Sequence, residues 1–63
     1  MAHRQTPQVV RSWFEAVMDE AEEKLNDWER NFMAKIQWKV ENYMELTENQ
    51  YNKLEEIYAE KTS

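Results

Sequence analysis

The sequence predicts an all-α mini-domain of two or three helices, whose C-terminal half forms an antiparallel helical hairpin. Three observations support this fold class. The 63 residues include no glycine and one proline, so the residues that favour β-hairpin turns are scarce. Apolar side chains recur at steps of three and four residues, which is helical spacing. Two segments, beginning at Asn26 and Thr47, match the capping box that starts a helix.

The first predicted helix spans residues 7–25. Thr6 offers a side-chain oxygen to a free backbone amide, and Pro7 suits the first helical position because its missing N–H is not needed there. The buried stripe of this helix is predicted to contain Val10, Phe14, Val17, Ala21 and Leu25. We expect residues 1–5 to fray ahead of it.

The second predicted helix covers residues 27–44, and its start allows two interpretations. Asn26 and Glu29 match a capping box, which would separate this helix from the first. However, neither glycine nor proline interrupts the chain, and the apolar period continues across the junction. One continuous helix would be about 57 Å long and would need a second copy of the chain to bury its stripe. The predicted stripe contains Leu25, Trp28, Phe32, Ile36, Val40 and Tyr43.

The third predicted helix spans residues 48–61. Thr47 and Gln50 have the spacing of a capping box, and Leu46 is placed to pack onto Tyr51 as a hydrophobic staple. Because the preceding connection is short, we expect the second and third helices to lie antiparallel. The apolar side of this helix is predicted to contain Tyr51, Leu54, Ile57 and Tyr58.

The spacing of residues in the second and third helices resembles a two-helix segment of small phage-encoded proteins and of the ends of some phage replication proteins. The matching residues are Trp28, Phe32, Ile36, Leu46, Thr47, Gln50, Leu54, Ile57, Tyr58 and Lys61. The resemblance covers about half of the chain and identifies no functional residues. It implies a mobile-element origin, and small acidic helical phage proteins include anti-CRISPR inhibitors and other anti-defence factors.

Trp38 is the large aromatic residue that falls outside the predicted stripe. It shares the opposite side of the second helix with Asn31, Lys35 and Asn42. Tryptophan is enriched among the residues that dominate binding energy at protein interfaces, so we predict that these four residues bind a partner. The alternative is that Trp38 packs beneath another helix.

Acidic residues outnumber basic ones, thirteen to eight, for a net charge of −5. This charge disfavours direct binding of nucleic acid. The acids are concentrated between residues 15 and 29. We predict that they meet a basic surface of a partner, or mimic the phosphates of a nucleic acid, although a solvated helix face explains the same pattern. The candidate residues are Glu15, Asp19, Glu22 and Glu23.

No catalytic, cofactor or metal site is predicted. The one histidine, His3, lies in the segment expected to fray, and Ser12 and Ser63 have no base with a fixed geometry. We therefore predict that the protein is not an enzyme. No uncharged run approaches the roughly 20 residues that span a bilayer, and no signal peptide is visible, so we expect a cytoplasmic location.

These observations together predict a small acidic protein-binding module. The specific hypothesis is a phage or mobile-element inhibitor, similar to anti-CRISPR proteins, that blocks a nucleoprotein effector with a basic surface. One alternative is a self-associating helical hairpin with an assembly role, completed as a homodimer. A second alternative is a phage DNA-replication accessory that binds single strands through Arg30, Lys35 and Trp38.

Overall fold

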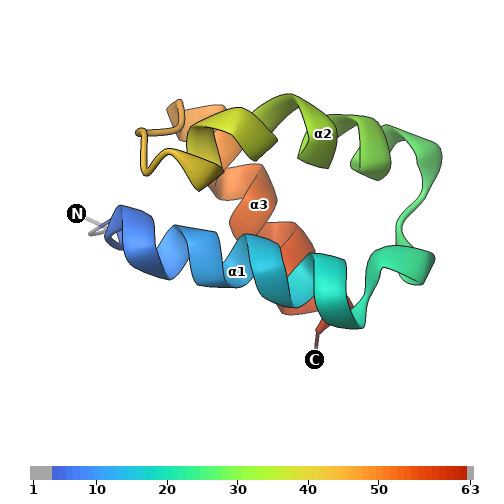
Figure 1. The fold of residues 1–63 in the computed structure, drawn as a ribbon. Helices are drawn as coiled ribbons and strands as arrows, with labels where there is room; N and C mark the ends of the chain where they lie inside the picture. The colour runs from blue at the N-terminus through green and yellow to red at the C-terminus, as the bar shows by residue number, and fades with distance from the viewer. Residues whose placement is uncertain (1–3, 63) are drawn as a thin grey trace.

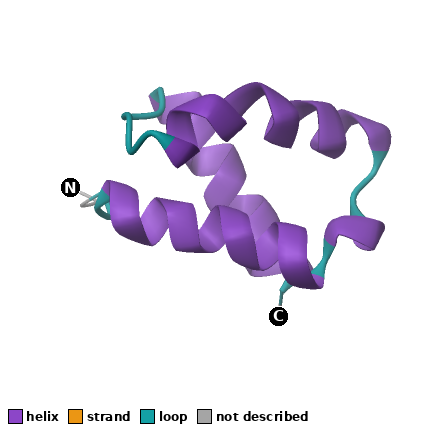
Figure 2. Ribbon diagram, in the orientation of Figure 1, coloured by secondary structure: helices purple, strands orange, loops and turns teal. Residues whose placement is uncertain are grey.

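A computed structural model describes residues 4–62, and this part of the chain is all-helical without a strand. Three α-helices, α1 (Pro7–Glu20), α2 (Asp27–Glu41) and α3 (Glu48–Lys61), are accompanied by a short 3-10 turn, η1 (Glu22–Lys24). Figure 1 shows α1 and α2 running in opposite directions, with α3 turning back from the end of α2 and crossing behind them. Figure 2 shows that loops form only the connections between these helices and the chain ends.

The start of each α-helix is fixed by a side-chain cap. Thr6 accepts a hydrogen bond from the Val9 amide at 3.3 Å. At α2, Asn26 Oδ1 accepts from the Glu29 amide at 2.7 Å, and the Glu29 carboxylate accepts from the Asn26 amide at 3.0 Å. Thr47 and Gln50 form the same reciprocal pair at α3. Both predicted capping boxes are therefore present.

The helix is interrupted between α1 and α2, so the two do not form one long helix. α1 ends at Glu20, earlier than the predicted 25, and η1 with an extended Leu25 turns the chain into α2. Ala21 and Leu25 are nevertheless buried, at 0% and 5% exposure. These two side chains close the end of the core. The apolar spacing therefore continues across the junction even though the helix has ended.

The core lies where the three helices meet. α1 contributes Val10, Phe14 and Val17, while α3 contributes Leu54 and Ile57. The most extensive helix contact is between α1 and α3. There the half-buried Trp13 ring stacks on Tyr58 and lies tilted against Tyr51, with both ring centroids 5.6 Å from its own. Tyr51 of α3 also belongs to the core. The remaining core side chains come from α2 and the connections, namely Leu25, Met33, Ile36, Val40 and Leu46.

The predicted stripe of the second helix was wrong at Trp28 and Tyr43, which are 58% and 49% exposed. The buried side of α2 instead contains Glu29, Met33, Ile36 and Val40. At 100° per residue, this side is rotated by about 50° from the predicted one. Glu29 lies on this side because its carboxylate meets both the Asn26 amide and the Lys61 ammonium of α3, and Met33 lies about one turn further along the same side.

α2 ends at Glu41, earlier than the predicted 44, and Tyr43 follows it in an unusual conformation. Its φ of 56° lies in the left-handed region that glycine normally occupies. The Met44 amide donates to the Lys39 carbonyl at 2.8 Å and the Tyr43 amide to the Val40 carbonyl at 3.2 Å, which is the Schellman pattern. The Tyr43 hydroxyl accepts from Arg11 of α1 at 2.8 Å. This contact ties the end of α2 to α1 and gives a reason for tyrosine at a glycine-like position.

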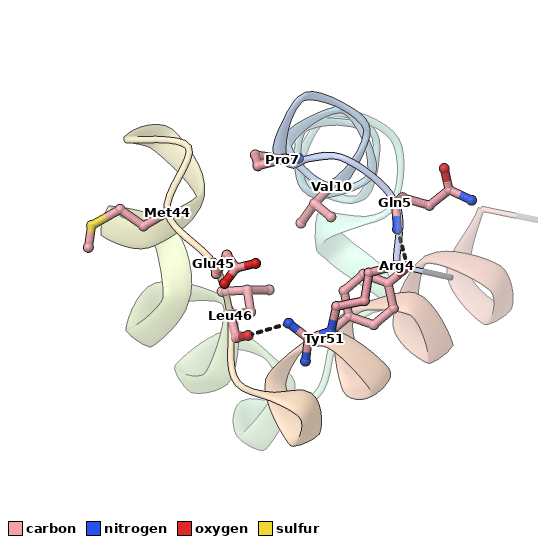
Figure 3. A pocket seen from close by; sticks show the side chains of 8 residues that line it. All are labelled: Arg4, Gln5, Pro7, Val10, Met44, Glu45, Leu46 and Tyr51. Atoms are coloured by element: carbon pink, nitrogen blue, oxygen red, sulfur yellow. Dashed lines mark hydrogen bonds between the residues drawn. The ribbon is translucent and has the colours of Figure 1, made fainter. Parts of the chain in front are cut away.

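The expectation of a frayed start was wrong for Arg4 and Gln5. The Arg4 guanidinium donates to the Leu46 carbonyl at 2.8 Å and lies over the Tyr51 ring, while the Gln5 amide donates to the Tyr51 hydroxyl at 2.9 Å. Figure 3 shows these residues around a hollow beside the loop that precedes α3. The rest of that expectation concerns residues 1–3, including His3, which lie outside the described residues. Ser63 also lies outside them.

Candidate functional site

The candidate site is the outer face of α2, which we call the aromatic face: Trp28, Asn31, Phe32, Lys35, Trp38 and Asn42. Trp38 is 64% exposed, so it does not pack beneath another helix. Asn31, Lys35 and Asn42 are exposed on the same side, as their spacing predicts. Asn42 also has a local role, because its side-chain amide donates to the Trp38 carbonyl at 2.8 Å.

Sequence reasoning missed Trp28 and Phe32 as members of this face. Their rings stack with centroids 5.5 Å apart and planes 5° apart. The Lys53 ammonium of α3 lies 5.0 Å from the centre of the Trp28 ring. A shallow hollow lies between this pair, Asn31 and Lys35. The Asn26–Glu29 capping box, which the sequence already predicts, did not reveal them, because a capping box does not determine which side of its helix is buried. Glu29 lies inward, where it meets Lys61 of α3.

The aromatic face carries positive charge on a protein that is acidic as a whole. Lys35 lies among the aromatic residues, and none of the six residues of the face is acidic. At its edge toward α3, the Lys39 ammonium donates to Gln50 at 3.4 Å. The Lys53 ammonium donates to Glu56 at 2.8 Å, and this hydrogen bond raises the pKa of Lys53 above its usual value. Lys53 therefore stays charged at neutral pH.

The predicted acidic residues form a separate surface. Glu15 and Asp19 lie on α1, and Glu22 and Glu23 lie on η1; all four are exposed. Glu15 accepts from Arg11 at 3.0 Å. The structure does not bring these acids to the Trp38 side of the molecule.

Arg30 is not part of the aromatic face either. Its guanidinium lies 3.8 Å from the Glu22 carboxylate. The positions of Arg30 and Lys35 differ by about 140° around α2, at 100° per residue. The three residues predicted for a single-strand site, Arg30, Lys35 and Trp38, are thus not assembled on one face.

The described part of the chain contains neither a metal-binding cluster nor a membrane-spanning helix. Residues 4–62 contain no group of three or more side chains suited to hold a metal ion. None of their helices is long and apolar enough to cross a membrane. No known family model, curated protein or solved structure matches the chain. The assignment of function therefore depends on the geometry of the two surfaces.

Proposed function

We propose that the protein is a non-enzymatic protein-binding module that docks through the aromatic face of α2. The observation that carries this proposal is the pair of exposed tryptophans, Trp28 and Trp38, on one face of one helix. Fully burying a large apolar side chain is worth about 1.5–3 kcal/mol, so a partner that covers both rings gains several kcal/mol. Such aromatic residues are typical anchors of protein interfaces.

The way α2 is held also supports this proposal. Its first turn is fixed by the reciprocal bonds of Asn26 and Glu29, and its last by the Schellman pattern around Tyr43. Its inner side is anchored by Met33, Ile36 and Val40 in the core. A partner would therefore meet a face whose backbone is already ordered, which lowers the entropy cost of binding.

The more specific form of the proposal is an inhibitor of a nucleoprotein effector, similar to anti-CRISPR proteins and acting in the host cytoplasm. The exposed acids Asp19, Glu22 and Glu23 support it, since effectors of this kind display basic channels that an acidic surface can occupy. The aromatic face would then supply affinity and the acidic surface would block the channel.

The test is inhibition of DNA or RNA cleavage by a panel of purified CRISPR effector complexes. We expect Trp38→Ala to weaken inhibition at least tenfold, while Glu55→Ala on the exposed side of α3 serves as the matched control. Combined charge reversal at Asp19, Glu22 and Glu23 should weaken inhibition further at low salt. If the wild-type protein binds none of the effectors, the anti-CRISPR form of the proposal is refuted.

Self-association is the second candidate, since the same exposed aromatic rings could cover one another in a homodimer. Light scattering across a dilution series separates the two. A monomer at micromolar concentration leaves the aromatic face free for a foreign partner, whereas a dimer that Trp38→Ala dissociates would favour the assembly role. The replication-accessory alternative predicts salt-dependent binding of an oligonucleotide, and no binding at low salt would exclude it.

A further inference from the structure

A second surface, the α1–α2 groove, lies on the other side of α2 from the aromatic face. Two adjoining hollows of about 200 and 220 Å³ share Phe14, Met18 and Gln37 in their lining. Gln37 and Lys35 differ by about 200° around α2, at 100° per residue, which places the groove and the aromatic face on opposite sides of the helix. A partner bound at the aromatic face alone would leave the groove open.

The floor of the groove is apolar and adaptable. Phe14 and Met33 form its base and are almost fully buried, while Met18 is partly exposed above them. Methionine side chains are flexible and fit many shapes, which is why they recur on surfaces that bind amphipathic helices. Met18 lines both hollows, so a partner that fills either one would contact its side chain.

The rim of the groove is acidic. It carries four carboxylates and two guanidinium groups, from Glu15, Asp19, Glu22, Glu41, Arg11 and Arg30. Both arginines are already engaged by rim acids, Arg11 by Glu15 at 3.0 Å and Arg30 by Glu22 at 3.8 Å. Asp19 has no ion pair of this kind among the described residues. The charge that remains for a partner is therefore negative.

We infer that the α1–α2 groove binds a basic amphipathic helix of a partner protein. The groove lies between the antiparallel helices α1 and α2. A helix of the partner that lays its apolar side on Met18 would continue the packing of the bundle. From Arg11 to Asp19 the rim extends about 12 Å along α1, which is slightly more than two helical turns. Apolar anchors at positions i, i+4 and i+7 of the bound helix match this length, and lysine or arginine beside them faces Asp19 and Glu15.

The probe for this inference is an 18-residue helical peptide of leucine and lysine, with leucine along one side. We expect calorimetry to show that the peptide binds and that its affinity falls as salt is raised. In NMR spectra, binding should shift the amide resonances of Phe14, Met18 and Gln37. Asp19→Lys should weaken binding at least tenfold, whereas Glu55→Lys, which makes the same charge change on α3, should weaken it less than threefold. Circular dichroism checks that both variants remain folded.

Met18→Glu tests whether the apolar floor matters. It adds a negative charge to the groove, so a purely electrostatic contact would become tighter, whereas a helix packed on the floor should bind at least fivefold more weakly. Trp38→Ala should leave peptide binding unchanged, which separates this inference from the proposed function. Equal weakening by Asp19→Lys and Glu55→Lys, tighter binding by Met18→Glu, or resonance shifts confined to the aromatic face would each overturn it.

Discussion

Glu29 is the one buried charged side chain among the described residues, and its replacement should show how the three helices are joined. Its carboxylate accepts a hydrogen bond from the Asn26 backbone amide at the start of α2. The same carboxylate lies 3.5 Å from the Lys61 ammonium in the last turn of α3. The side chains of Glu29 and Lys61 are 9% and 24% exposed, so water screens this ion pair only in part. We predict that the carboxylate stabilises both the helix start and the docking of α3.

The magnitude follows from these two contacts. A hydrogen bond to a charged group contributes about 1.5–3 kcal/mol, and a partly exposed ion pair at this distance contributes about 1 kcal/mol or less. Glu29→Ala should therefore lower the free energy of unfolding by about 2–3 kcal/mol. Glu29→Gln keeps an acceptor oxygen for Asn26 and should lower it by only about 1 kcal/mol. A domain of this size has roughly 3–9 kcal/mol of stability, so the alanine variant should lose a large share of it.

The assay is urea unfolding followed by circular dichroism for Glu29→Gln, Lys61→Met and the double variant. Lys61→Met keeps most of the apolar stem of lysine, so the cycle isolates the charge interaction, for which we expect a coupling energy of about 0.5–1 kcal/mol. If Glu29→Gln is as damaging as Glu29→Ala, the cap does not depend on an acceptor oxygen and the reasoning fails. A coupling energy of zero would refute the contribution of the ion pair to α3 docking.

Three further predictions concern α2, its end and the core. Trp38→Ala should change the free energy of unfolding by less than about 1 kcal/mol, because the ring is mostly exposed; a loss of 3–5 kcal/mol in urea unfolding would show that the ring is buried in solution. Leu54→Ala should destabilise by about 2–5 kcal/mol, since the side chain is fully buried, and a thermal melt that is unchanged would contradict the packing described. In an Arg11→Ala background, Tyr43→Gly should stabilise by about 0.5–1 kcal/mol, because glycine relieves the left-handed conformation once the contact with Arg11 is gone. Destabilisation in that background would mean that the tyrosine ring stabilises the turn in another way.

Much of the fold could be predicted because local signals at the helix starts agree with the tertiary structure. The Asn26 and Thr47 caps lie where their side chains predict, and the stripe of α1 from Val10 to Val17 is buried as its spacing predicts. The end of α1 could not be predicted in the same way. Ala21 and Leu25 keep the apolar period after the helix has ended, so the period alone does not distinguish a helix from a turn that also faces the core.

The candidate site was harder to predict than the fold. Trp38 and its polar neighbours share one face as expected, but Trp28 and Phe32 were assigned to the buried stripe because their spacing from Leu25 is helical. The deciding fact was the inward position of Glu29, which depends on Lys61 at the far end of the sequence. A contact between such distant positions leaves no periodic signal. The contacts of Arg4 with Leu46 and Tyr51 are of the same kind.

The packing of α1 against α3 has a consequence for synthesis of the protein. Trp13 is covered by Tyr51 and Tyr58, which are made 38 and 45 residues later. At the usual 5–20 residues per second, this leaves the apolar side of α1 without its main cover for roughly 2–9 s. The core is therefore completed only after α3 has been made. We expect nascent chains that stop before α3 to stay unfolded and to be the form that chaperones bind.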